Sequence, residues 1–417
     1  MRSICLVRLA VLLTVLAVAY AVTPRDRQQG MSQPHTVVSG SMAAAILGPH
    51  FRQPCGECQF PLICGVDTTD ISQRVICPNC GKRQTWSPGL LPRRGDQAWL
   101  DTRAPLRRWR VFAYLNDDGL TEIKRLIGRP GERITFDEGD ILIDGIRLQK
   151  TPPQFRDIRQ LVHDDRFRSS SEIAPQRWRP EQVSAKNWQR TSNGWFFSGT
   201  AADDQSALRY HHYLTYESPL SRETPQLIQD DYPYNANISR PLHFVDDVMV
   251  EMDVTLSKAT SLTWKFSTRA GDVMIEVDGS GRVNVRHGSQ QQSWAIHLHR
   301  GAENLLVGIC DRRVMWQWGG QWKTMELQWS NRREASVTPI DVTASGGPGT
   351  LTNLRVWRDV YYFRPPYLRQ HQTLSRGQWF MLGDNVPVSV DGRHHKGGVE
   401  VVRFVGEVNI WPRSKRP

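Results

Sequence analysis

Short stretches in which apolar and polar residues alternate recur through the second half of the chain. Residues 248–256 (VMVEMDVTL), 261–266 (SLTWKF) and 273–277 (VMIEV) are examples, and glycine or polar turns follow them. Alternation with period 2 is typical of β-strands that bury one face. Many short strands at near-regular spacing predict an antiparallel β-sandwich within residues 153–362. The pattern therefore predicts a mainly β fold.

Strands are also predicted before this region. Residues 134–143 (ITFDEGDILI) form a hairpin pattern in which Glu138 and Gly139 break two apolar stretches. The residues around Lys124 have a strand pattern as well. Successive side chains of a strand point to opposite faces, so we expect Lys124 and Ile123 to face opposite sides of the sheet.

The N-terminal residues 4–22 form an apolar segment that contains one charged residue, Arg8. A membrane-spanning helix needs ~20 such residues, so residues 1–22 are predicted to be a membrane anchor. The alternative is a cleaved secretory signal, because residues 17–19 (AVA) resemble a cleavage site. A cleaved signal would leave the bulk of the chain outside the cytoplasm, whereas the charges beside an anchor, at Arg2, Arg25 and Arg27, do not fix its orientation.

Composition and charge limit the classes of function. With 417 residues, 23% charged and 39% hydrophobic, the chain is long enough for two or three folded domains. The net charge is +11, but the basic residues are spread along the chain. No basic run suggests an arm that binds nucleic acid, so nucleic acid is not an expected partner. The positive excess could lie near anionic membrane lipid, and an ordinary solvated surface explains it equally well.

Four of the seven cysteines form two C-x2-C pairs, Cys55 with Cys58 and Cys77 with Cys80. Four thiolates at this spacing can surround Zn²⁺ tetrahedrally, which predicts a small zinc ribbon at residues 51–84. A closed site of four cysteines leaves no open position for water, so we expect a structural zinc without a catalytic role. The alternative is two disulfides, which are stable outside the cytoplasm and would leave Cys64 over.

Three short segments carry residues that suit a serine nucleophile with a lysine base. They are residues 37–42 (VVSGSM), 123–132 (IKRLIGRPGE) and 383–393 (GDNVPVSVDGR). A serine hydroxyl is a weak nucleophile until a neighbouring base takes its proton. A lysine can serve when burial beside apolar side chains favours its neutral form. Glycine at position 40 permits a tight turn that exposes Ser41.

Together and in this order, the three segments resemble the type I signal peptidases, which are membrane-anchored serine proteases with a Ser-Lys dyad. The resemblance implies that Ser41 is the nucleophile and Lys124 the general base. It implies an oxyanion hole made by the Ser39 hydroxyl and the Ser41 N–H. It also implies that Ser389 bonds the lysine. Further supporting positions are Asp391 and Arg393, as an ion pair, and the turn Gly383, Asp384 and Asn385.

The same resemblance implies a substrate and a location. The substrates would be secreted preproteins, cut after a small-x-small motif without a catalytic cofactor. Apolar residues would line the pocket for the small side chains: Val37, Val38, Met42 and Ile123. The protein would cross the cytoplasmic (inner) membrane once, with its catalytic domain on the extracytoplasmic side. The chain departs from the family pattern at residues 44–45, 386–388 and 392.

The insert at residues 153–362 looks like the concanavalin-type jelly rolls that recur in carbohydrate-binding modules. It holds ten of the fifteen tryptophans, so it is expected to have a core of its own. Aromatic side chains there could stack on sugars, which would make a carbohydrate its ligand. A protein ligand is the other expectation for the insert. The alternative is that these aromatics are core residues of a structural insert.

The predicted organisation is a signal-peptidase-type antiparallel β core with one transmembrane helix, a small zinc ribbon and an inserted β-sandwich. The predicted segments are 1–22 (anchor), 23–50 (tether and nucleophile segment), 51–84 (zinc ribbon), 85–152 (core with the lysine segment), 153–362 (sandwich) and 363–417 (closing segment of the core). Two other functions stay open. One is a surface carbohydrate- or protein-binding protein on a degenerate protease core. The other is a Ser-Lys protease dedicated to one partner.

Overall fold

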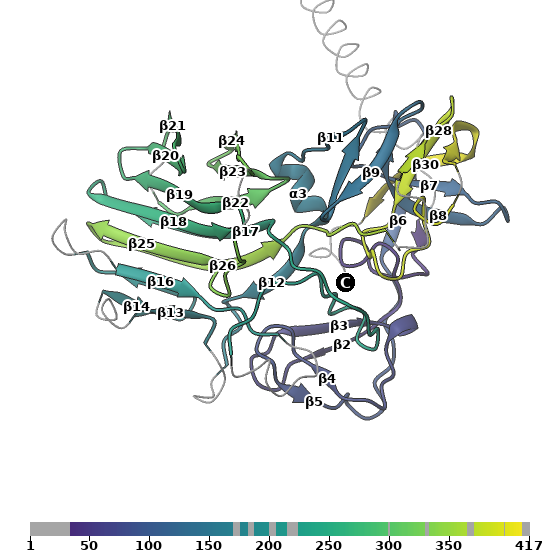
Figure 1. Cartoon of the computed structure of the whole chain (residues 1–417). Coiled ribbons are helices and arrows are strands. Elements are labelled where there is room, and N and C mark those ends of the chain that lie inside the picture. Colours follow the sequence, from purple (N-terminus) through teal and green to yellow (C-terminus); the bar gives the residue numbers. More distant parts are fainter. Residues whose placement is uncertain are drawn as a thin grey trace, which may run out of the picture.

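The computed structural model describes residues 34–169, 176–181, 187–199, 206–214, 224–298, 301–329, 333–364, 371–395 and 397–410. The fold of these residues is mainly β, as the alternating pattern predicts, with one short α-helix and two 3-10 helices. Figure 1 shows three parts: a large β-sandwich, a smaller group of sheets beside it, and a lobe below them that contains the paired cysteines. We call these parts the sandwich, the dyad core and the cysteine lobe (residues 50–84).

The dyad core is built on two sheets from both ends of the described chain. The larger sheet has the order β1-β6-β30-β7-β8-β28-β29, and the smaller has the order β11-β10-β9-β27. The strands of the larger sheet are β1 (His35–Thr36), β6 (Gln97–Asp101), β30 (Phe404–Ile410), β7 (Val111–Leu115), β8 (Thr121–Gly128), β28 (Gln378–Leu382) and β29 (Val399–Glu400), with the 3-10 helix η4 (Val401–Arg403) before β30. Those of the smaller sheet are β11 (Ile146–Arg147), β10 (Asp140–Ile143), β9 (Arg133–Asp137) and β27 (His371–Thr373).

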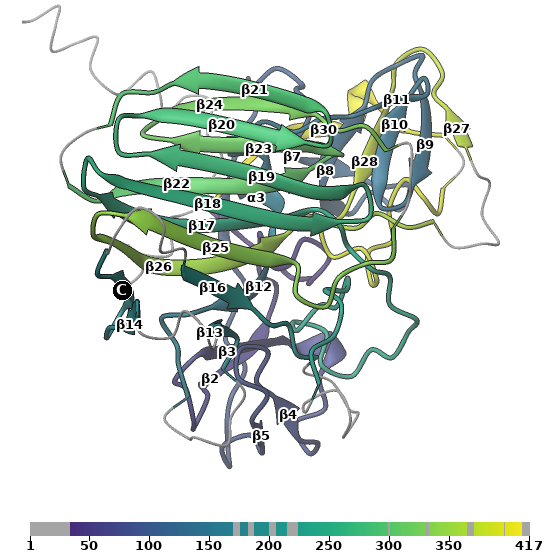
Figure 2. The ribbon, with the colours of Figure 1, turned by 60° about the vertical axis from the view of Figure 1, so that its left-hand side comes forward.

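The sandwich consists of two antiparallel sheets that stack face to face (Figure 2). One sheet contains β14 (Trp188–Arg190), β15 (Gly194–Phe197), β26 (Gly349–Arg358), β17 (Val248–Leu256), β22 (Glu303–Cys310), β23 (Arg313–Trp318) and β24 (Gln321–Glu326), and β12 (Gln160–Asp164) also pairs with β26. The other contains β13 (Trp178–Pro180), β16 (Ser206–Tyr210), β25 (Ile340–Gly346), β18 (Thr260–Thr268), β19 (Gly271–Asp278), β20 (Arg282–His287) and β21 (Gln290–Ala295).

The core of the sandwich lies between these two sheets and explains the aromatic content of the insert. Strand β18 alternates strictly between buried and half-buried positions, so its buried side chains, such as Trp264, point into the core. Several other tryptophans of the insert belong to the same buried cluster: Trp178, Trp188, Trp195, Trp316 and Trp318. Most aromatics of the sandwich therefore stabilise the fold by burying apolar surface.

A short helix joins the dyad core to the outer face of the sandwich. Helix α3 (Pro152–Ile158) begins with a capping box formed by Thr151 and Gln154. Its fully buried Phe155 packs in a cluster with Met249, Leu306, Cys310 and Met315. Strand β22 is therefore buried on both faces over most of its length. This contact fixes the sandwich against the dyad core.

The cysteine lobe contains two small hairpins below the other two parts in Figure 1. The first pairs β2 (His50–Pro54) with β3 (Pro61–Gly65), which the 3-10 helix η1 (Val66–Thr68) follows. The second pairs β4 (Val75–Ile76) with β5 (Arg83–Gln84). The lobe follows the nucleophile segment directly in the sequence, so its position limits where the turn with Ser41 can lie.

The expectation of a single-pass inner-membrane protein is corrected. Among the described residues, no helix is long and apolar enough to cross a membrane. Helix α3 has seven residues, whereas a membrane-spanning helix needs ~20. The predicted anchor at residues 1–22 lies outside the described residues.

Candidate functional site

The structure brings the three sequence segments together at one end of the dyad core. Ser41 lies in the turn after β1, Lys124 on β8, and the turn 383–385 directly after β28. Strand β8 pairs with β7 on one side, so Phe112 lies opposite Lys124. On its other side it pairs with β28, whose Leu382 lies opposite Arg125. The pairing of β8 with β28 thus sets the closing segment beside the lysine.

Ser41 and Lys124 form a contact between side chains that are 83 residues apart in sequence. The Lys124 Nζ donates a hydrogen bond to the Ser41 Oγ over 3.3 Å. Lys124 is only 4% exposed, whereas Ser41 is half-buried. The lysine is therefore largely withdrawn from water, and the hydroxyl that it contacts is accessible. A base within hydrogen-bond reach of a nucleophile is the arrangement that proton abstraction requires.

Glu122 is a third charged group at the dyad, two residues before the lysine on the same strand. Its Oε2 lies 3.5 Å from the Lys124 Nζ, and it accepts hydrogen bonds from Asn116 and from the Tyr114 hydroxyl. Burial alone would raise the pKa of the Glu122 carboxyl. The hydrogen bond from Asn116 and the charge of Lys124 outweigh that effect, so this pKa lies below its usual value. Glu122 is therefore an anion that stabilises a positive charge on the lysine.

Ser39 lies on the accessible side of the nucleophile. Its Oγ is 3.3 Å from the Ser41 Oγ, and Ser39 itself is exposed. A hydroxyl at this place could donate to a substrate oxygen. Its role in an oxyanion hole stays a prediction.

The nucleophile turn is fixed from behind by the closing segment. The Asn385 N–H donates to the Ser41 carbonyl oxygen over 3.0 Å, and the Asn385 Nδ2 donates to the Gly40 carbonyl oxygen over 2.9 Å. Arg125 forms a buried bidentate ion pair with Asp384. The lysine strand and the serine turn are thus both attached to residues 384–385. A Cβ at Gly383 would lie 2.7 Å from the Ser41 carbonyl oxygen, so this close approach requires glycine.

Asp391 and Arg393 form a second buried ion pair, with a 2.9 Å contact between the Arg393 Nε and the Asp391 Oδ1. Asp391 also accepts a hydrogen bond from the Gly383 N–H. Burial opposes ionisation of Asp391, but the Arg393 charge outweighs it and holds the pKa of this carboxyl well below its usual range. The pair therefore holds the closing loop in place.

Ser389 does not make the contact that the resemblance implies. Its Oγ is buried and has no hydrogen-bond partner among the described residues. A Cβ at Gly383 would lie 2.0 Å from this oxygen, which shows how tightly the two residues pack. The structure thus places Ser389 beside the turn that supports Ser41, without a bond to Lys124.

The four residues expected to line a substrate pocket have different surroundings. Val37 and Met42 are buried in an apolar cluster with Ile46 and Ala98, and the half-buried Ile123 packs against it. Val38 is 77% exposed. Val38 and Ile123 can therefore meet a substrate directly, while Val37 and Met42 support the turn from inside.

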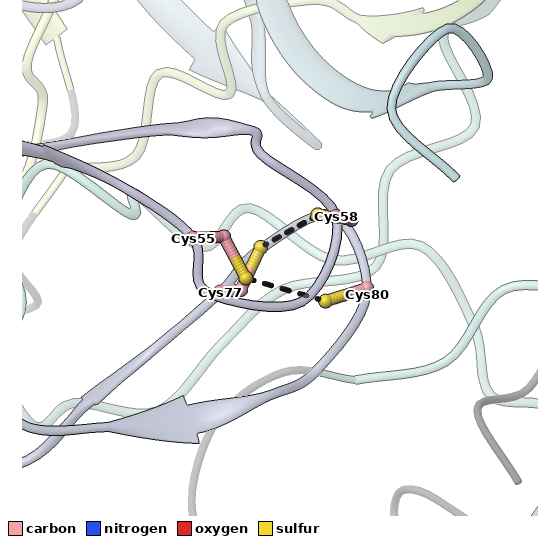
Figure 3. A group of neighbouring side chains, drawn as sticks. All are labelled: Cys55, Cys58, Cys77 and Cys80. Atoms are coloured by element: carbon pink, nitrogen blue, oxygen red, sulfur yellow. Dashed lines mark hydrogen bonds between the residues drawn. The ribbon is translucent and has the colours of Figure 1, made fainter. Parts of the chain in front are cut away.

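The four paired cysteines meet in the cysteine lobe (Figure 3). Each C-x2-C pair forms a turn closed by backbone bonds: Gln59 N–H donates to the Cys55 oxygen, and Gly81 N–H donates to the Cys77 oxygen. Both donors have positive φ, +62° at Gln59 and +77° at Gly81. The two turns are therefore equivalent, and glycine meets the backbone requirement in the second one.

The sulfur positions fit a tetrahedral metal site. The Sγ atoms of Cys55 and Cys80 are 3.7 Å apart, as are those of Cys58 and Cys77, and all four lie within 4.8 Å of one another. Four sulfurs at ~2.3 Å from a zinc ion would be ~3.8 Å apart in a tetrahedron. The four thiols are free, so the alternative of two disulfides is not observed. The hydrogen bond between the Cys58 and Cys77 side chains raises the pKa of Cys77 far above its usual value.

The sequence analysis missed two residues near the dyad, Glu122 and Asn235. Glu122 is adjacent to the lysine segment, and alternation along β8 could have placed it on the Lys124 face. Asn235 contacts Asn385 over a separation of 150 residues, from a polar stretch with no regular pattern. Only the folded chain shows that this stretch reaches the site.

No protein-family model and no curated protein matches the chain. Among solved structures, a carbohydrate-binding module from Bacillus subtilis is similar over 43% of this chain and 94% of its own, with 10% identity and a TM-score of 0.26. A β-glucanase from Bacillus licheniformis covers 44% of this chain and 92% of its own, with 11% identity and a TM-score of 0.28. A Bacillus subtilis protein with a galectin-like fold covers 48% and 99%, with 10% identity and a TM-score of 0.33.

The assignment to the type I signal peptidases was wrong. No model of that family matches the chain, and the similar solved structures are carbohydrate-binding, glucanase and galectin-like proteins. The removal of signal peptides from secreted preproteins, which depended on that assignment, is withdrawn with it. At these identities and TM-scores the similarity gives the chain neither a family nor a ligand. The contact between Ser41 and Lys124 does not depend on the assignment.

Proposed function

We propose that the chain is a serine endopeptidase in which Ser41 is the nucleophile and Lys124 the base. The observation that carries this proposal is the 3.3 Å contact between the buried Lys124 Nζ and an accessible serine hydroxyl. The residues behind the dyad hold both groups in place, which is what an oriented nucleophile requires.

The reaction follows from these positions. The Ser41 Oγ attacks the carbonyl carbon of a peptide bond, and the hydroxyl proton passes to the neutral amine of Lys124, which becomes an ammonium. The tetrahedral intermediate collapses when the lysine returns this proton to the leaving amine, which leaves an ester on Ser41. Water then hydrolyses the ester, with Lys124 again as the base. Glu122 stabilises the ammonium that forms in each step.

An open strand edge beside the dyad favours an extended peptide as the substrate. Strand β28 pairs with β8 only over residues 125–128, whereas β7 pairs with residues 121–125. No strand of the described residues pairs with the other edge of residues 121–124. An extended peptide can add to such an edge through main-chain hydrogen bonds, which would bring its carbonyl groups past Ser41. We therefore propose a protein partner with an exposed, extended segment as the substrate.

The proposal is tested with a peptide library prepared by tryptic digestion of a proteome. The wild-type chain, Ser41→Ala, Lys124→Ala and the control Ser375→Ala are incubated with the library, and new termini are identified by mass spectrometry. Ser375 is an exposed serine in the closing segment, outside the dyad. We expect new termini with the wild type and with Ser375→Ala only. An identical set of termini from Ser41→Ala would contradict the proposal.

The cysteine site has a proposed ligand of its own. We propose that Cys55, Cys58, Cys77 and Cys80 hold a zinc ion, because their sulfur separations match a tetrahedral site. A bound zinc ion would cross-link the two hairpins of the lobe, which are otherwise only two strands each. Four protein ligands complete its coordination, so it would supply no catalytic chemistry.

A second candidate function concerns the sandwich. Strands β21 and β24 form its upper edge in Figure 2, and each carries a tryptophan that is not fully buried, Trp294 and Trp322. Trp322 is 41% exposed. Exposed indole faces stack on sugar rings, so this edge could bind a carbohydrate. Binding of wild type and Trp322→Ala to a glycan array tests this, with the exposed Val402→Ala as a control. Equal signals from all three proteins would exclude the edge as a sugar site.

A further inference from the structure

A segment of the insert reaches out of the sandwich to the back of the nucleophile turn. Residues 232–237, which we call the bracing segment, lie between β16 and β17 in sequence. The Tyr232 hydroxyl donates to the Asp384 carbonyl oxygen over 3.2 Å. The Gly65 N–H of the cysteine lobe donates to the Tyr234 carbonyl oxygen over 2.8 Å. The bracing segment therefore touches both the closing segment and the cysteine lobe.

The ring of Tyr234 fills the space between the nucleophile turn and the cysteine lobe. Tyr234 is 5% exposed. A Cβ at Gly40 would lie 2.7 Å from a ring carbon, and a Cβ at Gly65 would lie 2.4 Å from the same carbon. Gly40 does not have a positive φ. The requirement for glycine at this position therefore comes from the close packing against Tyr234. The packing leaves the turn little freedom to move backward.

Asn235 forms a reciprocal amide pair with Asn385. The Asn235 Nδ2 donates to the Asn385 Oδ1 over 2.7 Å, and the Asn385 Nδ2 donates to the Asn235 Oδ1 over 2.9 Å. The Asn385 Nδ2 also donates to the Gly40 carbonyl oxygen. Both side chains are buried, Asn235 at 6% and Asn385 at 0% exposure. Every hydrogen of the Asn385 amide therefore has a defined acceptor, and Asn235 determines which way this amide faces.

We propose that Asn235 is a positioning residue for Ser41, a role that rests on the proposed serine nucleophile. Without Asn235, the buried Asn385 amide loses a donor and an acceptor, and an unpaired buried polar group is costly. Rotation of this amide to find new partners would take its Nδ2 away from Gly40. The nucleophile turn would then lose one of its two bonds to residue 385. Residues of the insert thus take part in orienting the nucleophile.

The test uses the full chain and a biotinylated fluorophosphonate. In this reaction the Ser41 Oγ bonds to phosphorus, fluoride leaves, and the hydroxyl proton passes to Lys124. We expect Asn235→Ala to lower the maximal rate of labelling about tenfold, because a displaced nucleophile reacts slowly, with the half-saturating probe concentration unchanged. Asn284→Ala, an asparagine on β20 of the sandwich, is the matched control and should label like the wild type.

Amide hydrogen exchange gives a second readout that needs no reaction at Ser41. In Asn235→Ala, a peptide that contains residues 383–390 should exchange faster, because the Asn385 N–H bonds the Ser41 carbonyl oxygen. Wild-type labelling and exchange in a folded Asn235→Ala would overturn the positioning role alone. Absence of labelling in the wild type would overturn the serine nucleophile, and exchange would then decide whether Asn235 orders the turn. If Asn235→Ala fails to fold, Asn235→Ser replaces it, with the same expected losses.

Discussion

Arg125 and Asp384 form a buried ion pair between the residue after Lys124 and the residue before Asn385. The Arg125 Nε donates to the Asp384 Oδ1 over 2.8 Å, and both side chains are almost fully buried, at 3% and 0% exposure. Arg125 lies on the strand that contains Lys124, and Asp384 lies beside Asn385, which bonds the turn of Ser41. The pair therefore links the position of the lysine strand to that of the serine turn.

Removal of one partner of this pair should destabilise the fold strongly. Asp384→Ala leaves the Arg125 guanidinium buried without its counter-charge, which typically costs about 3–5 kcal/mol of unfolding free energy. Urea denaturation measures this loss. The control is Asp117→Ala, which removes the Arg403–Asp117 pair on the surface, where both partners are 40% exposed or more. That variant should lose little or no stability, because water and salt screen an exposed pair. Equal losses in the two variants would contradict the structural role of Arg125 and Asp384.

Glu122 should control the pH at which the dyad becomes active. Its carboxyl has a lowered pKa, with burial opposing and the Asn116 bond and the Lys124 charge favouring ionisation. The resulting anion stabilises the ammonium that forms when Lys124 takes the Ser41 proton. In Glu122→Gln this ammonium has no counter-charge, so labelling of Ser41 should be slower than in the wild type. Protonation of Glu122 removes the same charge, so wild-type labelling should fall toward the Glu122→Gln rate as pH drops through the lowered pKa of Glu122.

The pH profile of Ser41 labelling, measured with the fluorophosphonate probe, tests this effect of Glu122. Glu334→Gln, an exposed glutamate far along the chain, is the control and should keep the wild-type profile. A profile of Glu122→Gln that coincides with the wild type would show that Glu122 does not act on the lysine.

Removal of metal should loosen the cysteine lobe. The purified protein is expected to contain one zinc ion per chain by elemental analysis, and Cys77→Ser should contain less. Treatment with 1,10-phenanthroline should lower the thermal midpoint and speed amide exchange in residues 50–84, because the two hairpins lose their cross-link. Cys64→Ser is the control, because Cys64 lies outside the four-sulfur cluster. A metal-free protein with protected amides in the lobe would contradict the zinc site.

A buried carboxyl at the junction of the dyad core and the sandwich should make stability depend on pH. Burial and the nearby Asp311 raise the pKa of Asp140 to about 7, although Arg147 and Lys150 oppose the shift. The folded state thus holds a proton that the unfolded chain releases near its usual value of 3.8. The stabilisation that comes from the proton on Asp140 is complete below the usual pKa of 3.8 and is lost as pH rises through about 7.

Urea denaturation at about pH 5 and about pH 8 measures the contribution of Asp140. The wild type should lose more unfolding free energy over this interval than Asp140→Asn, by on the order of 2 kcal/mol. The asparagine cannot ionise, so its variant lacks this part of the pH dependence. Parallel pH dependences of the two proteins would contradict the raised pKa.

The sequence predicted the elements of the dyad core better than their surroundings. The alternation around residues 121–127 is local, so it placed Lys124 on a strand, as β8 shows. The two C-x2-C pairs are local as well, and their four sulfurs do meet. Tertiary contacts leave no such local signal. Asn235 reaches Asn385 because the insert folds back, and Val37 and Met42 are buried by packing against other segments.

The tryptophans of the insert illustrate the same limit. Their number predicted a core but could not separate core residues from a binding surface. In the structure Trp264 and Trp316 are 0% and 2% exposed, while Trp322 lies on an edge strand. Which tryptophan is exposed depends on the order of strands in each sheet, and strand order is set by long-range pairing.

The most direct test of the serine nucleophile is the intact mass of the protein after reaction with the fluorophosphonate. We expect the wild type to gain the mass of one phosphonyl group, located on Ser41 by peptide mapping. Ser41→Ala and Lys124→Ala should gain none over the same time, and the control Lys258→Ala, an exposed lysine of the sandwich, should react like the wild type. Modification of another residue, or equal modification of Lys124→Ala, would contradict the Ser41–Lys124 dyad.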